Sequence, residues 1–242
     1  MSNNKKSKSK NLAATSAKAK KLLADARKEG ALSKGGAQTL DIVDLGAEIG
    51  SGLGVDVSDV ESSQVVLVTM MPDDSGSISS ANNTRRVING HNAVLDALVA
   101  SRQADDIFAH TRYLNGDVLC PFTAVNQAVQ MSTSNYSPNK GTPLYDQSVV
   151  VLGTVIAKAQ EFVNNGVPVR TITLLITDGQ DVHSQRASAK DVRNLVEDML
   201  ASENHIVAAM GLDNGSTNFR KVFREMGIED RWILTPGSSA SE

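Results

Sequence analysis

The sequence predicts an α/β fold, in which a doubly wound, mainly parallel open sheet has helices on both faces and one antiparallel edge strand. Val65–Met71 is an almost continuous apolar run, and Thr171–Thr177 and His205–Leu212 resemble it, as is typical of parallel strands buried on both faces. Helical stretches lie between these runs, which indicates right-handed crossovers. The turn signal Asn115-Gly116 predicts the hairpin that supplies the antiparallel edge.

The other elements follow in order along the chain. Asn11–Glu29 has helix-forming composition and stops at Gly30. The hairpin strands are predicted at Ile107–Tyr113 and Asp117–Phe122, and a short last strand at Arg231–Leu234. Further helices are predicted at Asn82–Arg102, Val125–Met131, Leu144–Asn164, Ala187–Ser202 and Asn218–Met226.

The charge is distributed unevenly along the 242 residues, whose net charge is −3. Residues 1–36 contain nine Lys and one Arg against one Asp and one Glu, a net charge of +8, so the remainder carries −11. We therefore expect a basic, partly disordered or helical arm over residues 1–36 and a linker or attachment segment over 37–63. The α/β domain is expected over 64–235, followed by a flexible end over 236–242.

Composition excludes several classes of protein. Aromatic residues make up only 4%, which disfavours stacking platforms for single-stranded nucleic acid. The single cysteine, Cys120, excludes a disulfide framework and a cysteine-based zinc site. The longest apolar runs are too short to span a membrane, and the basic N-terminus lacks the apolar stretch of a secretory signal. These observations predict a cytoplasmic protein without a membrane span.

Oxygen-bearing side chains cluster where the predicted strands end. The first buried strand is followed by Asp73-Asp74-Ser75-Gly76-Ser77, and the second ends in Thr177-Asp178-Gly179. Lys140-Gly141-Thr142-Pro143 opens the long helix. In open parallel sheets, ligands bind beyond the carboxyl ends of the strands. Carboxylates and hydroxyls without His or Cys favour a hard divalent cation, Mg²⁺ first, with Mn²⁺ and Ca²⁺ as alternatives.

The three motifs resemble the metal-ion-dependent adhesion site of von Willebrand factor A domains, also called integrin I-type domains, and the likeness extends over residues 64–235. We expect a domain of the intracellular, bacterial type. The resemblance implies a binding module rather than an enzyme, which engages an Asp or Glu of a partner protein through the metal. It implies these metal ligands, some acting through water: Asp73, Ser75, Ser77, Thr142 and Asp178. One departure is Pro72, which we expect to end the first strand early.

Neighbouring residues are candidates for the surface that meets the partner. These are Asp74, which we expect to point to solvent, Gly76, Gly141, Gly179, Asp181 and His183.

Simpler interpretations exist for each motif. Asp73–Ser77 could only start a helix, Thr142 could cap the helix at Pro143, and Asp178-Gly179 could be only a turn. A hydrolase using Ser75 or Ser77 with His183 and Asp178 is disfavoured, because the chain has no G-x-S-x-G elbow.

Two other functions stay open at this stage. The chain could be a non-catalytic subunit or regulator of an AAA+ ATPase, as in chelatase-like complexes, or of a tellurite-resistance or stress-response complex. It has no G-x-x-x-x-G-K-[ST] segment of its own. Alternatively, residues 5–34 could bind nucleic acid through their positive charge.

Overall fold

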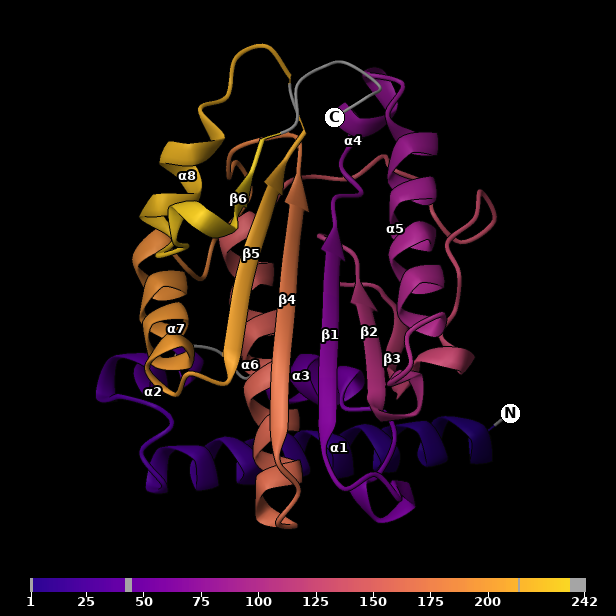
Figure 1. The fold of residues 1–242 in the computed structure, drawn as a ribbon, viewed down its shortest axis with the longest axis vertical. Helices are drawn as coiled ribbons and strands as arrows, with labels where there is room; N and C mark the ends of the chain where they lie inside the picture. Colours follow the sequence, from indigo (N-terminus) through magenta and orange to yellow (C-terminus); the bar gives the residue numbers. More distant parts are fainter. Residues whose placement is uncertain (1, 42–44, 213, 236–242) are drawn as a thin grey trace.

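In the part of the chain that the structure describes, a mixed sheet of six strands has the order β3-β2-β1-β4-β5-β6 (Figure 1). The computed structural model describes residues 2–41, 45–212 and 214–235. All neighbouring strands run parallel except β2 and β3, which form the predicted antiparallel hairpin. The strands are β1 (Val65–Pro72), β2 (Ile107–Arg112), β3 (Val118–Ala124), β4 (Val169–Thr177), β5 (His205–Gly211) and β6 (Ile233–Leu234).

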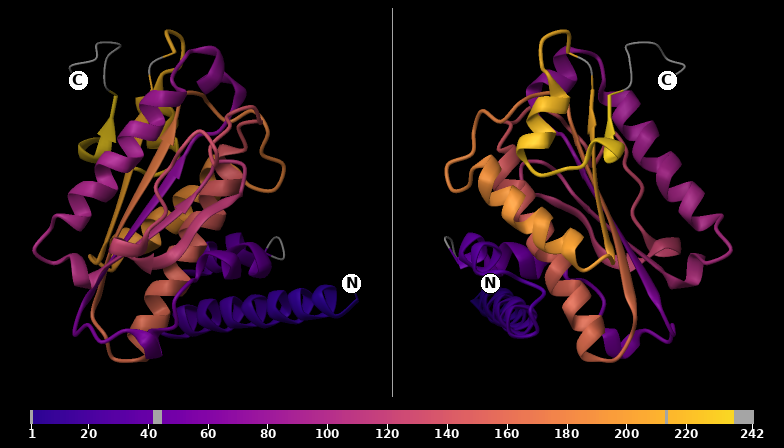
Figure 2. Two further views of the ribbon diagram at one scale, coloured as in Figure 1. Left: turned by 90° about the vertical axis from the view of Figure 1, so that its right-hand side faces the viewer. Right: turned by 60° about the vertical axis from the view of Figure 1, so that its left-hand side comes forward.

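Helices lie on both sides of this sheet, which confirms the predicted fold class. The helix α5 lies on one side, and α1, α2, α3, α6, α7 and α8 lie on the other (Figures 1 and 2). The short α4 begins directly above β1 in Figure 1. The helices are α1 (Ser2–Lys28), α2 (Lys34–Asp41), α3 (Gly46–Gly52), α4 (Gly76–Ser80), α5 (Thr84–Val99), α6 (Leu144–Asn164), α7 (Ala189–Ala201) and α8 (Phe219–Glu225).

Helix α6 is the centre of the larger core. Its bounds are those predicted from the sequence, and every residue from Leu144 to Phe162 except Tyr145 is buried. A helix that is buried all round needs neighbours on every side, and α6 packs against β4, α1, α3 and α7. This packing fixes the position of its first turn, which borders the site described below. None of the described helices has the length and apolar character needed to cross a membrane.

Three local predictions were wrong. Pro72 does not end β1 early: it is the last residue of the strand, pairs with Ile176, and its carbonyl accepts a hydrogen bond from the N–H of Leu114 at 3.0 Å. A proline is tolerated there because the strand needs no further donor. The helix predicted at Val125–Met131 is only a 3₁₀ turn over Val125–Gln127. The last strand is reduced to Ile233–Leu234 because a 3₁₀ turn precedes it.

Residues of the N-terminal segments expected to form an arm and a linker pack into the main hydrophobic core of the domain. Helix α1 buries Ala19, Leu22 and Ala26 in the same core as α6. Helix α3 falls within the segment interpreted as a linker, and α2 crosses the expected boundary between arm and linker. Helix α3 approaches α1 closely at Gly50, where a Cβ atom would lie 2.7 Å from the carbonyl oxygen of Thr15. The absence of a side chain at Gly50 therefore permits this contact.

Part of the positive charge of α1 is used within the protein. Nζ of Lys18 lies 2.6 Å from a carboxylate oxygen of Glu161 and 2.9 Å from one of Asp56. Glu161 also accepts a hydrogen bond at 2.8 Å from the fully buried Lys158. These contacts tie α1 to α6. Binding of nucleic acid by residues 5–34 stays a prediction.

Replacing Leu22 by Ala tests whether docking of α1 contributes to stability. The substitution removes a buried side chain from the core and should lower the free energy of unfolding by about 2–4 kcal/mol. Leu12→Ala is the matched control on the same helix, because Leu12 is 53% exposed, and should change it by less than about 0.5 kcal/mol. Urea unfolding measures both, and equal effects of the two substitutions would show that α1 is not docked.

Candidate functional site

The Asp73 carboxylate connects the ends of β1 and β4. Its Oδ1 accepts a hydrogen bond from the N–H of Ser75 at 2.7 Å. Its Oδ2 accepts one from the hydroxyl of Thr177 at 2.7 Å and one from the N–H of Asp178 at 3.3 Å. Asp73 is completely buried, so these donors replace the water that a carboxylate would otherwise bind. The first and the second predicted motif are thereby held side by side.

The hydroxyls of the first motif face the carboxylate of the second. The two oxygens Ser75 Oγ and Ser77 Oγ are 2.8 Å apart, and Ser77 Oγ donates a hydrogen bond of 2.6 Å to Oδ1 of Asp178. The other oxygen, Asp178 Oδ2, is buried and has no hydrogen-bond partner within the described part of the chain. Burial, with the nearby negative charge of Asp73, raises the pKa of Asp178, and the hydrogen bond from Ser77 opposes this.

The third motif lies against the other two. The N–H of Gly76 donates a 2.9 Å hydrogen bond to the carbonyl of Lys140, which brings the segment before Thr142 next to the serines. Thr142 itself is buried and lies beside Gly179, where a Cβ atom would be 3.9 Å from Thr142 Cγ2. The structure thus brings all three predicted motifs to one end of the sheet.

The capping interpretations do not account for these hydroxyls. Ser75 does occupy the N-cap position of α4, but its side chain makes no capping hydrogen bond. Helix α6 begins at Leu144 with Pro143 at the N-cap position, so Thr142 lies one residue before the cap.

Asp74 differs from the prediction, because its side chain is buried rather than pointing to solvent. One of its oxygens, Oδ1, accepts hydrogen bonds from the backbone N–H of Asn115 at 3.0 Å and from its side-chain amide at 2.8 Å. The same amide donates to the carbonyl of Gly141 at 2.8 Å. Burial raises the pKa of Asp74, against the opposing effect of the Asn115 hydrogen bonds. Asp74 therefore holds the hairpin turn next to the third motif.

His183 positions Thr142 through the backbone. Its Nδ1 accepts a hydrogen bond from the N–H of Thr142 at 2.8 Å, and a Cβ atom at Gly141 would lie 2.9 Å from that nitrogen. The absence of a side chain at Gly141 permits this close approach. Since the two serines bond to each other and to Asp178, the imagined arrangement of serine nucleophile and histidine base is not formed among the described residues.

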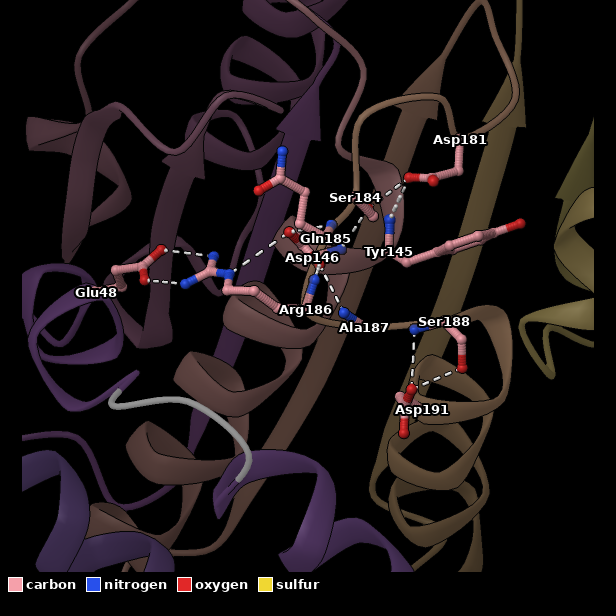
Figure 3. A network of polar contacts seen from close by, with 10 residues as sticks. All are labelled: Glu48, Tyr145, Asp146, Asp181, Ser184, Gln185, Arg186, Ala187, Ser188 and Asp191. Carbon is pink, nitrogen blue, oxygen red and sulfur yellow. Dashed lines mark hydrogen bonds and ion pairs between the residues drawn. The ribbon is translucent and has the colours of Figure 1, made fainter.

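The loop that follows Asp178 is fastened to the first turn of α6 by Asp146 (Figure 3). The buried Asp146 carboxylate accepts hydrogen bonds of 2.8–3.0 Å from three consecutive backbone N–H groups, those of residues 185, 186 and 187. The side chain of Arg186 also lies 3.5 Å from this carboxylate and pairs with Glu48 of α3 at 2.6 Å. The loop is thus linked to both α6 and α3.

Asp181 makes a second attachment of the same loop. It accepts hydrogen bonds from the N–H of Tyr145 at 3.2 Å and from the hydroxyl of Ser184 at 2.5 Å. The N–H of Asp146 in turn donates to the hydroxyl of Ser184 at 2.9 Å (Figure 3). The sequence analysis names Asp181 as a candidate for contact with a partner. In the structure its carboxylate attaches the loop to α6.

Several residues at the site were missed by the sequence analysis. The hydroxyl of Tyr136 donates to the carbonyl of Asp73, the side-chain amide of Asn214 donates to the carbonyl of Asp178, and Thr177 holds Asp73. Only Thr177 carried a signal, because it directly precedes Asp178 at a strand end. Tyr136 and Asn214 come from irregular segments whose position depends on the folded chain.

The side chains of the three motifs offer only oxygen ligands, which suit a hard divalent cation better than a softer metal that prefers nitrogen or sulfur. The donor set consists of two carboxylates and three hydroxyls, with one carboxylate oxygen buried and unpaired, and oxygen ligands are those that Mg²⁺, Mn²⁺ and Ca²⁺ prefer. Among the residues that the structure describes, no three His, Cys, Asp or Glu side chains gather where they could hold a metal. A site here would therefore need its hydroxyls as ligands.

Comparison with known proteins finds similarity at the level of the fold. No family model matches the chain, and no curated protein matches it. The pilus adhesin SpaC of Lactobacillus rhamnosus GG, in its open conformation, is 13% identical, with a TM-score of 0.52 over 72% of this chain and 28% of that chain. Proximal thread matrix protein 1 of the mussel byssus is 15% identical, with a TM-score of 0.50 over 72% of this chain and 42% of that chain. The match spans less than half of either solved chain, and at these identities it supports the α/β fold alone.

Proposed function

We propose that this protein is a von Willebrand factor A-type binding module that holds a divalent cation, Mg²⁺ first, and uses it to engage a carboxylate of a partner protein. Mn²⁺ and Ca²⁺ are the alternatives. The ligands would be the five residues of the three motifs, some acting through water: Asp73, Ser75, Ser77, Thr142 and Asp178.

The observation that carries this proposal is the unpaired oxygen of Asp178. A buried carboxylate oxygen without a donor is unfavourable unless something compensates it. This oxygen belongs to the carboxylate that accepts a hydrogen bond from Ser77, beside the hydroxyl of Ser75. A cation bound there would supply the missing positive charge and would accept the hydroxyl oxygens as further ligands.

The donor set also favours a partner with an acidic side chain. Two carboxylates balance the charge of a divalent ion, and the hydroxyls are neutral, so the ion keeps Lewis acidity for one more oxygen ligand. Ser77 is exposed, which leaves this end of the sheet accessible. An Asp or Glu of the partner would displace water from the ion and form a charge-assisted contact at the centre of the interface.

The surface around the ion would be formed by exposed and half-buried residues beside the proposed ligands. Gly76, Gly141 and Gly179 are half-buried, and His183 is exposed as a residue although its Nδ1 accepts a hydrogen bond from Thr142. We propose these four as the partner-facing residues. Asp74 and Asp181 act within the protein instead, because their carboxylates accept hydrogen bonds from Asn115 and from Tyr145 and Ser184.

Isothermal titration of the full chain with Mg²⁺ tests the metal site. We expect one site in the unchanged protein and at least about tenfold weaker binding in Asp178→Asn, because one of the two ligand charges is removed while the shape is kept. The exposed Asp105→Asn is the matched control and should bind as the unchanged protein does. Absence of binding with Mg²⁺, Mn²⁺ and Ca²⁺ alike would contradict the proposal.

Partner capture tests the role of the metal. With the full chain immobilised in native lysate, at least one protein retained in Mg²⁺ should be lost in EDTA and with Asp73→Ala, because no ion then remains to receive its carboxylate. Asp105→Asn should retain the same proteins. Recovery of identical proteins under all these conditions would show that the contact does not depend on the metal.

A further inference from the structure

One face of the sheet presents apolar side chains over β4, β5 and β6. The register pairs Val68 of β1 with Ile172 of β4, and Ile172 with Ile206 of β5, so these side chains lie on the same face. Every second residue along these strands joins them, because side chains alternate between faces. This open face consists of Ile172, Leu174, Ile176, Ile206, Ala208, Met210 and Leu234.

The open face continues a surface that a helix already covers. On β1, Val68 and Met70 are buried in a cluster with Leu95 of α5. Over β4 and β5, Figure 1 shows no described helix in front of the strands, and in Figure 2 α5 lies on this side of the sheet. Ile172 and Leu234 are accordingly 38% and 47% exposed. The alternate residues of β4, such as Thr173 and Leu175, are buried on the opposite face.

Such a face is unusual for strands of this kind. Parallel strands are normally covered by helices on both faces, whereas here Ile172 and Leu234 are exposed and the other five residues are half-buried. Apolar surface left uncovered in this way is a feature of interaction sites. Since α5 covers the half over β1, a second helix beside α5 would give the strands β4 and β5 the same cover. Ile172, Leu174 and Ile176 extend over about 13 Å, which matches about nine residues of a helix.

A charge at one end of the open face indicates the chemistry of the occupant. Arg170 pairs with Val66 of β1. It lies two residues before Ile172 on β4 and therefore on the same face. It is exposed and lines a cavity of about 320 Å³ with Gln103 and Asn204. No hydrogen bond or ion pair of its guanidinium is found within residues 2–41, 45–212 and 214–235. A carboxylate on the occupant would complement this charge.

We propose that the open face docks an amphipathic helix of a partner protein, with its apolar side on β4 and β5 and an acidic residue at the end that meets Arg170. The surface is separate from the metal site, which lies at the carboxyl ends of the strands. Docking here therefore does not depend on the cation and persists in EDTA.

The test measures binding of a synthetic helix to the full chain by fluorescence anisotropy. The probe is a fluorescein-labelled 16-residue peptide with Leu along one side at spacings of three and four, Ala and Gln elsewhere, and Glu at both ends. A peptide of the same composition with its Leu residues spread around the helix is the control. We expect saturable binding of the first peptide only, unchanged by EDTA.

Variants locate the binding on the open face. Ile172→Lys and Leu234→Lys place a charge under the helix at exposed positions, so both should fold, as circular dichroism checks, and both should weaken binding at least about tenfold. Val129→Lys is the matched control, because Val129 is 44% exposed and does not belong to the open face. Arg170→Glu should reverse the preference, so that a peptide with Lys at both ends binds more tightly than the Glu peptide.

Three results would overturn the proposal. One is the absence of saturable binding to the unchanged protein, and another is equal binding of the control peptide. The third is a dimer in sedimentation that Ile172→Lys converts to a monomer, because the face would then be covered by a second copy of this chain.

Discussion

The site depends on the burial of a single carboxylate, Asp73. A fully buried acid needs donors for both oxygens, and here they come from two strand ends, Ser75 after β1 and Thr177 with Asp178 at the end of β4. The two loops are therefore held together before any ligand is present. A consequence is that the Asp178 side chain turns towards the serines with one oxygen unpaired. The architecture concentrates negative charge at one point and leaves it incompletely compensated, which is the electrostatic condition for binding a cation.

The surrounding loops are fixed by a second buried acid. The carboxylate of Asp146, at the start of α6, accepts hydrogen bonds from three backbone N–H groups of the loop after Asp178. Helix α6 is itself packed in the core on every side. Arg186 and Glu48 extend this attachment to α3 and so to the N-terminal helices. A site held in this way loses little conformational freedom when a ligand binds, which favours affinity. The open face, in contrast, is built from the strands β4, β5 and β6 and does not include these loops.

The sequence predicts the regular part of this structure well. Leu144–Asn164 is found as predicted because a long helical sequence ends at the turn signal Asn165-Gly166, and the buried strands follow from their composition. The three motifs also meet where they were expected, because parallel strands end at one edge of the sheet. These features depend on local sequence and on topology alone.

Other features depend on contacts that sequence cannot supply. The burial of Asp74 requires Asn115 of a distant hairpin, and the role of His183 requires the absence of a side chain at Gly141. The docking of α1 rests on small residues such as Ala19 and Ala26, which make only a weak apolar stripe. The open face was not predicted either, since an apolar strand shows no sign of whether a helix covers each of its faces.

The most direct measurement of the central claim is anomalous diffraction from crystals of the full chain soaked in Mn²⁺. The account predicts one strong peak within bonding distance of Ser75 Oγ and Ser77 Oγ and next to Oδ2 of Asp178. A map without a peak at this position, or with Asp178 Oδ2 bonded to a protein donor instead, would contradict it.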